Sequence, residues 1–372
     1  KKIFRGGKFM IGFIGVGACG GNIANEAFKS GYSAIAINYS KSDLNSLDRI
    51  PESKKLHLIG SEGVGKNRDV AINLINNNWE NILEFVKREI ITLNREIIFI
   101  PFSMSGGTGS GLSPMLIEML CAQFPNKTFV ALPILPQDNE PVQNQLNFIQ
   151  SSKELSKINI CIIPIDNNKC YSMNKKDMYN NINNSFINQL NEIISYTKKS
   201  SKYGILDFKD FASLLSINGV TTIVKADLSD IRNIESLSHD GFKKIINNSW
   251  NNSIFITPDS IEDIHGLGVI FNGQQEFLNI FNIHTLFAKE PLPENIYEGY
   301  YFEDHGCTVI AILSGMPWNN NRMKNAERKV VTSNKNEINQ KAYNFDFELT
   351  FSSEKEAIKT KSVTDIINKY KR

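Results

Sequence analysis

The stretch SMSGGTGSGLSP, residues 103–114, constrains the fold more than any other part of the sequence. It follows EIIFIPF (96–102), a continuously apolar run that predicts a buried strand. It runs into LSPMLIEMLCAQF (112–124), whose apolar residues recur at helical spacing. Glycine tolerates positive φ and lets a ligand approach the backbone closely. A strand, a glycine loop and a helix in this order direct backbone N–H groups and the positive helix end at one point, which suits a phosphate group.

Two further glycine loops follow apolar runs. GVGACGGN (15–22) follows FMIGFIGV (9–16), and GSEGVGKN (60–67) follows the short run LHLI (56–59). One glycine turn between a strand and a helix is often only a turn, whereas three at one edge of a sheet predict a ligand site. We therefore expect a phosphate-bearing ligand at the carboxyl ends of the strands.

The first 170 residues alternate between strand and helix patterns. Continuously apolar strands between amphipathic helices indicate a parallel sheet that is covered on both faces. The predicted strands are FMIGFIGV, SAIAIN, EIIFIPF, TFVALPIL and ICIIPI, and the predicted helices include NIANEAFKSG and INNNWENILEFVKREIITL.

The remainder of the chain begins with a long helical pattern at 175–199, followed by YGILDFKDFASLLS. Strand patterns then return, partly separated by helical patterns, and predict a smaller mixed α/β domain. The strand patterns are VTTIV (220–224), SIFIT (253–257), GLGVIF (266–271) and TVIAIL (308–313), and the helical patterns are 240–250 and 274–287.

Composition places the chain among ordinary globular proteins, with 41% hydrophobic and 22% charged residues. No apolar run approaches the roughly 18–20 residues that span a bilayer, and the opening KKIFRGGKFM has no apolar signal-peptide core. Five scattered cysteines without a CxxC pair indicate reduced thiols, and five scattered histidines lack metal-ligand spacing. We therefore expect a cytoplasmic protein with no membrane partner and no residue in a metal-ligand role.

Two familiar nucleotide motifs are near matches. Residues 15–20 satisfy GxGxxG, but the dinucleotide fold needs an acid at the end of its second strand, where this chain has Asn38, and the next acid is Asp43. Residues 60–67 miss a Walker A motif at the Ser/Thr that binds Mg²⁺. Neither motif accounts for the loop at 103–111, so an NAD-dependent oxidoreductase is kept only as the alternative from another class.

The residues also carry a family likeness. SGGTGSG resembles the tubulin signature GGGTGSG, with Ser105 in place of the first glycine, and GVGACGGN is similar to the first glycine loop of FtsZ. The order of the later segments agrees as well, and the chain resembles the Tubulin/FtsZ family of GTPases, in particular its TubZ branch from plasmids and phages. The resemblance implies an α/β tubulin/FtsZ fold: a Rossmann-like parallel-sheet GTPase domain, a central helix and a smaller mixed α/β C-terminal domain. The implied boundaries are a GTP-binding domain at 1–174, the central helix and catalytic loop at 175–211, a C-terminal activation domain at 212–317 and a basic C-terminal helix or tail at 318–372.

The resemblance implies that GTP or GDP binds at the glycine loops, with Mg²⁺ offsetting the phosphate charge. The first loop would lie against the phosphates and nucleoside, the signature loop would wrap the α- and β-phosphates, and the loop at 60–67 would sense the γ-phosphate. Glu140 matches a ribose contact. The implied nucleotide-binding residues of these loops are Gly17, Ala18, Cys19, Gly20, Asn22, Asn38, Gly65, Lys66, Asn67, Ser105, Gly106, Gly107, Thr108, Gly109, Ser110 and Glu140.

Guanine recognition is expected in MYNNINNSF (178–186), where Tyr179 and Asn183 lie four residues apart on one helix face. The family stacks an aromatic ring on the base and reads its edge with an asparagine. An amide both donates and accepts, as the guanine edge requires. Asn167 in PIDNN is the second expected base contact.

Catalysis is expected from Asp207 and Asp210 in LDFKDF. Acids at this spacing are also typical of a plain helix start. In the family, this loop lies at the opposite end of the subunit from the nucleotide and completes the active site of the next subunit. The resemblance therefore implies head-to-tail filaments, in which a carboxylate polarises the attacking water. The motif usually has an asparagine where this chain has Ile205.

The C-terminal segment is basic, with twelve Lys and Arg against seven Asp and Glu over residues 322–372. Cell-division FtsZ and eukaryotic tubulin have tails of other kinds, while TubZ-like GTPases engage an adaptor on centromere-like DNA. We therefore expect a GTPase that moves plasmid or phage DNA through a DNA-binding adaptor, without direct sequence-specific DNA binding. An FtsZ-like cell-division GTPase and a nucleotide-binding polymer that scarcely hydrolyses are the alternatives.

Overall fold

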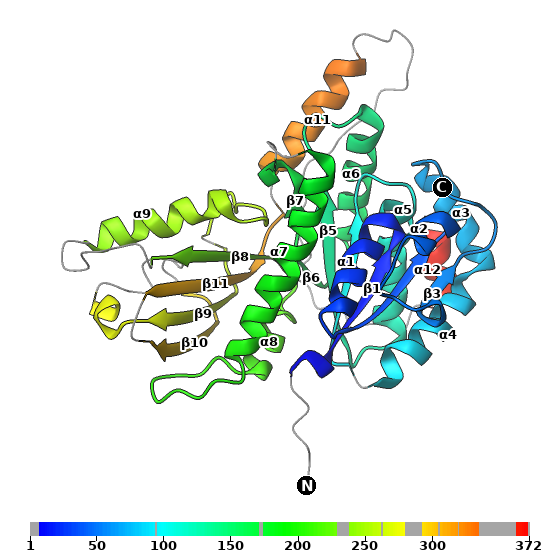
Figure 1. Ribbon diagram of the computed structural model, residues 1–372. Helices are drawn as coiled ribbons and strands as arrows, with labels where there is room; N and C mark the ends of the chain where they lie inside the picture. The colour runs from blue at the N-terminus through cyan, green and yellow to red at the C-terminus, as the bar shows by residue number, and fades with distance from the viewer. Residues whose placement is uncertain are drawn as a thin grey trace.

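The structure is a computed structural model that describes residues 7–93, 95–170, 174–228, 238–261, 263–279, 292–303, 306–318, 320–334 and 362–370. In this part of the chain, eleven strands form one sheet in the order β10–β9–β11–β8–β6–β5–β4–β1–β2–β3, with β7 paired to β5 (Figure 1). The strands are β1 (Ile11–Val16), β2 (Ser33–Asn38), β3 (Lys55–His57), β4 (Ile97–Ser103), β5 (Thr128–Leu135), β6 (Cys161–Ile162), β7 (Ile165–Asp166), β8 (Gly219–Asp227), β9 (Gly266–Gly273), β10 (Asn295–Phe302) and β11 (Cys307–Met316).

The half of the sheet from β3 to β6 is parallel, as the sequence predicts. Strand β1 lies between β2 and β4, so the order runs outward from β1 in both directions. Where the strand order reverses, the loops that follow neighbouring strands diverge and leave a crevice at the carboxyl ends. The crevice here is flanked by the loops after β1 and β4, and both are glycine loops.

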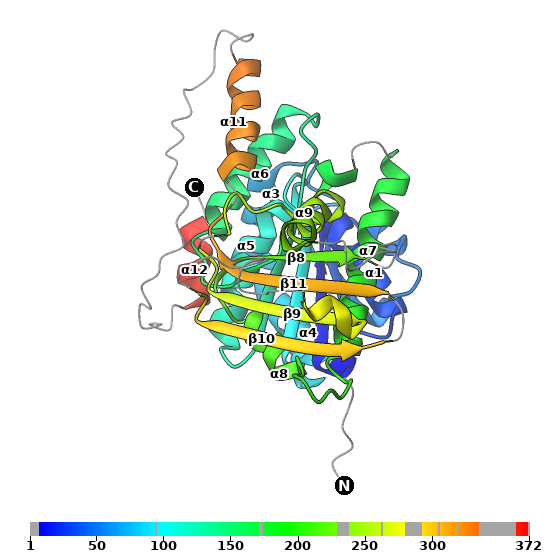
Figure 2. The same ribbon diagram turned by 90° about the vertical axis from the view of Figure 1, so that its left-hand side faces the viewer.

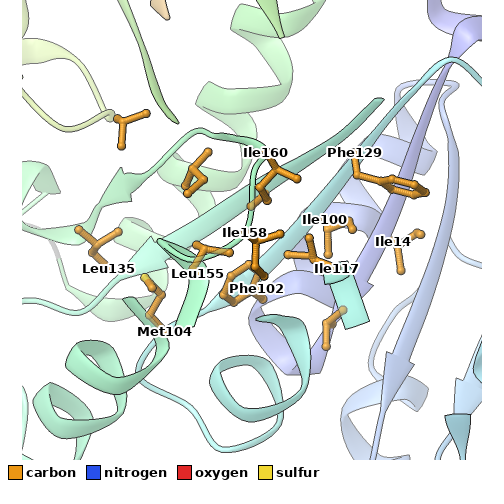
Figure 3. Close-up of a cluster of buried hydrophobic side chains, with 14 of the residues drawn as sticks. Ile14, Ile100, Phe102, Met104, Ile117, Phe129, Leu135, Leu155, Ile158 and Ile160 are labelled. Carbon is orange, nitrogen blue, oxygen red and sulfur yellow. The ribbon is translucent and has the colours of Figure 1, made fainter. Parts of the chain in front are cut away.

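Strand β1 shows why its half of the sheet is continuously apolar. Successive side chains point to opposite faces, and both faces are buried. Ile14 and Val16 join the core on one face, while Ile11 and Phe13 join the core on the other. Figure 3 shows the first of these cores, where Ile14 and Phe129 lie near Ile117.

Helices cover both faces of this half. The helices whose buried residues join the core around Phe13 are α1 (Gly17–Lys29), α2 (Lys41–Asn45), α7 (Lys175–Tyr196) and α8 (Phe208–Leu214). Those that join the core around Ile14 are α3 (Arg68–Asn73), α4 (Trp79–Glu89), α5 (Thr108–Gln123) and α6 (Val142–Leu155).

Helix α7 is the predicted central helix, and it runs between the two halves of the molecule (Figure 1). Its Phe186 makes edge contacts with Phe99 of β4, at 5.7 Å between ring centroids, and with Phe255, at 6.3 Å. Such aromatic contacts add to the burial of apolar area. Helix α7 therefore ties the parallel half to the second half of the chain.

The second half is the smaller mixed α/β unit that the sequence predicts. Strand β11 is antiparallel to β8 and β9, and β10 is parallel to β9 (Figure 2). Helix α9 (His239–Ser249) packs against β8. The pairing of β6 with β8, through Cys161 with Gly219 and Ile162 with Val220, continues the sheet from one half to the other.

In the second half, the structure differs from the sequence prediction at two places, and a third prediction lies partly outside the described residues. The segment 253–257 is not a strand: it has one bridge, from Phe255 to Ile165, and the Ser253 hydroxyl accepts a hydrogen bond from the Phe255 N–H at 3.3 Å, which occupies that donor locally. Strand β10 was not predicted, because NIYEGYYF mixes polar and aromatic residues without clear alternation. Of the helical pattern at 274–287, residues up to 279 are described, with a short 3-10 turn at Gln275–Asn279.

The helix predicted from Ile75 onward is interrupted at Asn78, before α4 begins. The Asn78 side chain donates to the carbonyls of Ile59 and Leu74, at 2.9 and 2.8 Å, and accepts from the Ile59 N–H at 2.7 Å. An asparagine that bonds to a neighbouring loop competes with helical hydrogen bonds. The interruption therefore anchors the loop at 59–67 to the body of the protein.

Two C-terminal helices return to the parallel half. Helix α11 (Asn320–Asn334) packs against α6, and α12 (Val363–Tyr370) packs against α5 (Figure 2). On α12, Lys369 and Tyr370 bond Glu118 of α5, with the Lys369 Nζ–Glu118 Oε2 distance at 2.8 Å and the Tyr370 hydroxyl at 3.0 Å. Both helices lie within 318–372, the segment in which the sequence predicts a basic helix or tail. The domain boundaries themselves stay predictions.

Among the helices of the described residues, none combines the length and apolar character needed to cross a membrane.

Candidate functional site

A cavity of about 450 Å³ lies at the carboxyl ends of β1, β2 and β4. Its volume falls within the range of small-molecule sites. All three predicted glycine loops contribute to its wall. The lining residues are 16–19 after β1, Asn38, Ser40 and Asp43 after β2, 62–66 after β3, and Ser103 with 106–109 after β4.

Helices α1 and α5 both begin at this cavity. The residues before their first turns, Val16 and Gly107, make no side-chain capping bond. The two starts are close together, since a Cβ built on Gly17 would lie 3.2 Å from the backbone nitrogen of Gly109. Helix starts carry free N–H donors and partial positive charge. Two of them at one cavity favour an anionic ligand with several oxygens.

Two glycines of the signature loop, Gly106 and Gly107, serve different purposes in the structure. A Cβ on Gly107 would lie 2.9 Å from Cα of Lys66 and 2.6 Å from Val64, so glycine lets the loop at 62–66 pack here. A Cβ on Gly106 would meet no protein atom within 4 Å. Gly106 also lines the cavity, so the space beside it is available to a ligand.

The signature loop is held from behind by Asn147 of α6. Its Nδ2 donates to the carbonyls of Lys66 and Ser105, each at 3.0 Å. The Ser110 hydroxyl donates to the Gly106 carbonyl, and the Ser105 hydroxyl lies 3.0 Å from that of Ser103. Ser105 and Ser110 therefore stabilise the loop and do not line the cavity, whereas Gly106, Gly107, Thr108 and Gly109 do.

A second contact that supports the signature loop arises because of a proline in α5. Pro114 lies inside α5 and has no N–H to donate to the carbonyl of Ser110, four residues earlier. The buried guanidinium of Arg68 donates to this carbonyl from Nε at 3.3 Å and from Nη2 at 3.0 Å. Arg68 also contacts Glu154 and Gln150 of α6. Because Arg68 directly follows the loop at 60–67, it joins that loop to the signature helix.

In the loop at 60–67, Gly65 and Lys66 line the cavity. Lys66 has φ of 64°, in the left-handed region that residues with side chains rarely adopt, and the residue is exposed. Asn67 has another use in the fold: its Oδ1 accepts from the N–H groups of Asp69 and Val70 and so caps α3.

From the first loop, Gly17, Ala18 and Cys19 line the cavity. Gly20 lies behind it, because its Cβ would meet the Pro101 carbonyl oxygen at 2.0 Å, and Asn22 is exposed on α1. Burial, together with the charge of Glu140, raises the pKa of the Cys19 thiol to about 12. A raised pKa disfavours the thiolate, the form of cysteine that acts as a nucleophile.

The cavity lining includes carboxylate and hydroxyl side chains. Asn38 donates from Nδ2 to Asp43 Oδ2 at 3.0 Å, and Asp43, Glu62 and Thr108 line the wall. Among the described residues, no three His, Cys, Asp or Glu side chains form a metal cluster. Mg²⁺ usually takes one or two carboxylates and completes its shell with phosphate and water oxygens. These residues fit an ion of that kind together with a phosphate ligand.

The expected nucleoside contacts lie outside the cavity lining. Glu140 accepts from the Gln137 N–H at 2.8 Å and from Asn144 Nδ2 at 2.6 Å. Asn167 is buried, and its Oδ1 has no hydrogen-bond partner. A buried acceptor of this kind is normally satisfied by a ligand or water. Asn183 is half-buried on α7, and the side chain of Tyr179 lies outside the described residues.

The two expected catalytic acids lie elsewhere. Asp207 caps α8 by accepting from the N–H groups of Lys209 and Asp210, at 2.7 and 2.9 Å, and Asp210 accepts from the Asp207 N–H at 2.9 Å. Neighbouring Phe208 approaches Gly7, before the start of β1, whereas the cavity begins at the end of β1. The acids are therefore at the opposite end of the sheet from the cavity.

Sequence reasoning missed the supporting residues. Asn147, Arg68 and the acids Asp43 and Glu62 carry no motif that marks them. Pro114 inside a helical pattern is a signal, since it predicts a carbonyl without its helical donor. The sequence does not show which donor takes that carbonyl.

Comparisons with known proteins agree with this geometry. Residues 10–175 match the model of the Tubulin/FtsZ family, GTPase domain. The chain is 27% identical over 314 residues to the tubulin-like protein CetZ of Pyrococcus abyssi, covering 82% of this chain and 84% of CetZ. It is 26% identical over 227 residues to the tubulin-like protein TubZ of Clostridium botulinum C phage, covering 59% and 60%.

Among solved structures, a GTPγS-form protofilament of TubZ from Bacillus thuringiensis serovar israelensis superposes with a TM-score of 0.73 at 17% identity, covering 88% of this chain and 93% of that one. The expected resemblance and fold are thus confirmed, and the family binds GTP and GDP. Residues 10–175 therefore match the GTPase domain of the Tubulin/FtsZ family, and the chain as a whole has the fold of that family.

Proposed function

We propose that this protein binds GTP in the cavity between α1 and α5, assembles head to tail into filaments and hydrolyses GTP at the subunit interfaces. The observation that carries the proposal is the meeting of two helix starts without side-chain caps beside the open space at Gly106. Gly17 to Cys19 and Gly106 to Gly109 would face the phosphates. Gly65 and Lys66 would face the terminal phosphate.

The nucleoside would extend toward Glu140, Asn167 and Asn183, with the ring of Tyr179 stacked on the base. The free Oδ1 of Asn167 supports this direction, because it needs an N–H donor. When Mg²⁺ is bound it offsets charge on the phosphates, and Asp43, Glu62 and Thr108 of the cavity lining would supply oxygen atoms to it.

The separation of the acids from the cavity supports hydrolysis between subunits. Asp207 and Asp210 cannot reach a ligand in the cavity of their own subunit, since they lie at the other end of the sheet. In a head-to-tail stack, the acids of one copy would face the cavity of the next, which is a heterologous contact that extends into a filament. A carboxylate there would polarise the attacking water. The protofilament form of the TubZ neighbour supports such stacking.

The experiment is GTP turnover measured against protein concentration. If each active site needs two subunits, phosphate release per subunit rises with concentration and levels off as filaments form. Light scattering and electron microscopy with GTP, GDP and a slowly hydrolysed analogue follow assembly. Turnover that is constant per subunit at all concentrations contradicts the shared site. Filaments without phosphate release indicate a non-hydrolysing polymer, and NADH fluorescence enhancement without GTP binding indicates the oxidoreductase.

For the cellular role, we propose segregation of plasmid or phage DNA through a DNA-binding adaptor that contacts the basic C-terminal segment. The TubZ relative and the excess of basic residues over 322–372 support this role. The CetZ relative matches a larger share of the chain than the TubZ relative does, so a deletion assay is needed to test this role. Loss of a resident plasmid on deletion supports segregation, and a division defect with normal plasmid retention supports the FtsZ-like alternative.

A further inference from the structure

Arg322 at the start of α11 reaches deep into the parallel half. Its side chain is buried, and its guanidinium lies over the ring of Phe148 at 5.4 Å from the centroid. It donates from Nε to Asp166 Oδ2 at 3.1 Å, from Nη1 to Asp138 Oδ1 at 2.6 Å, and from Nη2 to the Pro136 carbonyl. One arginine from the C-terminal segment thus holds two loops that lie far from it in the sequence.

The two loops are bonded to each other around this arginine. The Asp138 N–H donates to Asn168 Oδ1 at 2.9 Å, and the Asn168 N–H donates to Asp166 Oδ1 at 3.0 Å. Gln137 Nε2 donates to the Asn167 carbonyl at 3.3 Å. Arg322 therefore neutralises two neighbouring carboxylates whose mutual repulsion would otherwise separate the loops.

These loops carry Glu140 and Asn167, the ribose and base contacts of the proposed GTP site. The phosphate loops are held by other residues, Asn147 and Arg68. The site thus has two halves with separate supports. The support of the nucleoside half comes from α11, a helix outside the GTPase domain.

We propose that Arg322 is a positioning residue for the nucleoside half of the site, and that it couples the docking of α11 on α6 to nucleotide binding. The inference rests on the proposed function of the site. Coupling of this kind is reciprocal: if docked α11 favours nucleotide binding, bound nucleotide favours docked α11 by the same factor. The nucleotide bound in the site would then change how firmly α11 docks on α6, without any contact between α11 and the ligand.

The test compares two ligands that share only the phosphate half. GDP affinity is measured by calorimetry, and inorganic tripolyphosphate is measured as a competitor of GDP. Arg322→Lys keeps the positive charge but loses the forked donors. We expect it to weaken GDP binding about tenfold, within the usual range of coupled sites, and to leave tripolyphosphate affinity unchanged. In the wild type, GDP should slow hydrogen exchange in 320–334, and the variant should lose this protection.

Arg328→Lys on the exposed side of α11 is the matched control and should bind GDP like the wild type. Asp138→Asn gives the same comparison if Arg322→Lys fails to fold, because Asp138 is partly exposed and its loss leaves the Asp166 pair in place. GDP affinity in the folded variants equal to that of the control overturns this inference alone. Absence of GTP and GDP binding by the wild type overturns the proposed function and this inference with it.

Discussion

The guanidinium of Arg68 donates two hydrogen bonds to the carbonyl of Ser110, at 3.3 and 3.0 Å. The carbonyl is open to Arg68 because Pro114 has no N–H for it. The same guanidinium pairs with Glu154, and both side chains are largely buried. The helical hydrogen bond that Pro114 cannot donate is thus replaced by one from Arg68, which fixes the loop at 60–67 to α5.

Arg68→Met should destabilise the protein by about 3–5 kcal/mol, because it breaks the buried ion pair with Glu154. The double variant Arg68→Met/Glu154→Leu should recover part of this loss, measured by urea unfolding. Both variants should bind GTP more weakly, because neither restores a donor to Ser110. The exposed Arg88→Met serves as the control and should stay within about 0.5 kcal/mol of the wild type. Normal GTP affinity in both Arg68 variants contradicts the positioning role.

Alanine at Gly106 and Gly107 separates ligand contact from loop packing. At Gly107 the new Cβ would meet Val64 and the Lys66 backbone, so Gly107→Ala should lower both the melting temperature and GTP affinity. At Gly106 the Cβ meets no protein atom, so Gly106→Ala should keep the melting temperature of the free protein but still weaken GTP binding. Thermal unfolding and GTP titration check both. Wild-type affinity in Gly106→Ala would place the phosphates elsewhere.

The parallel half of the fold was predictable because its signals are local. Each strand there is a short apolar run, and the glycine loops after β1 and β4 directly follow such runs. SAIAIN and TFVALPIL match β2 and β5 at both ends. The segment 253–257 is also a short apolar run, but its pairing is limited to one antiparallel bridge, between Phe255 and Ile165.

The supports of the site were not predictable, because they join residues that are distant in the sequence. Arg322 and Asp166 are separated by 156 positions, and Asn147 and Lys66 by 81. No spacing rule connects such pairs in a single sequence. The acids at 207 and 210 were singled out by the family resemblance, with a plain helix start as the other interpretation. The structure shows that they form a capping box, but the structure of one chain does not test their catalytic role.

Substitution of Asp207 and Asp210 by asparagine separates the proposed catalytic role of these acids from helix capping. An amide oxygen caps a helix as well as a carboxylate does, so Asp207→Asn should keep the stability of α8, whereas Asp207→Ala should cost about 0.5–2 kcal/mol. Asp207→Asn and Asp210→Asn should bind GTP normally but hydrolyse it about 100-fold more slowly or worse, with more persistent filaments. Phosphate release and sedimentation measure these effects. Unchanged turnover in both single variants and in the double would falsify the assignment.

A mixing experiment tests whether the acids act on the neighbouring subunit. Gly107→Ala has a damaged cavity and intact acids, while Asp207→Asn has an intact cavity and damaged acids. In mixed filaments, an interface that joins the intact halves should hydrolyse GTP, so the mixture should exceed the sum of the two proteins alone. Strict additivity contradicts a shared active site.

Glu327 on α11 gives the docking of this helix a pH dependence. Its side chain is buried, and Oε1 has no hydrogen-bond partner. Burial raises the pKa of Glu327 to about 7, and the charge of Lys153 partly opposes this. Because the folded pKa lies above the ordinary value of 4.5, the native state keeps a proton that the unfolded chain releases. The resulting destabilisation is absent below pH 4.5, grows between pH 4.5 and 7, and is constant above pH 7.

Glu327→Gln removes this titration and keeps the shape of the side chain. The variant should melt at the same temperature as the wild type well below pH 4.5, where Glu327 is protonated in both states. It should melt at a higher temperature above pH 7, where the wild type buries a charge. Melting curves across this range measure the difference, with exposed Glu84→Gln as the control for removing a carboxylate elsewhere. A gap between Glu327→Gln and the wild type that does not change with pH contradicts a buried, titrating Glu327, because the charge would then stay in water in both states.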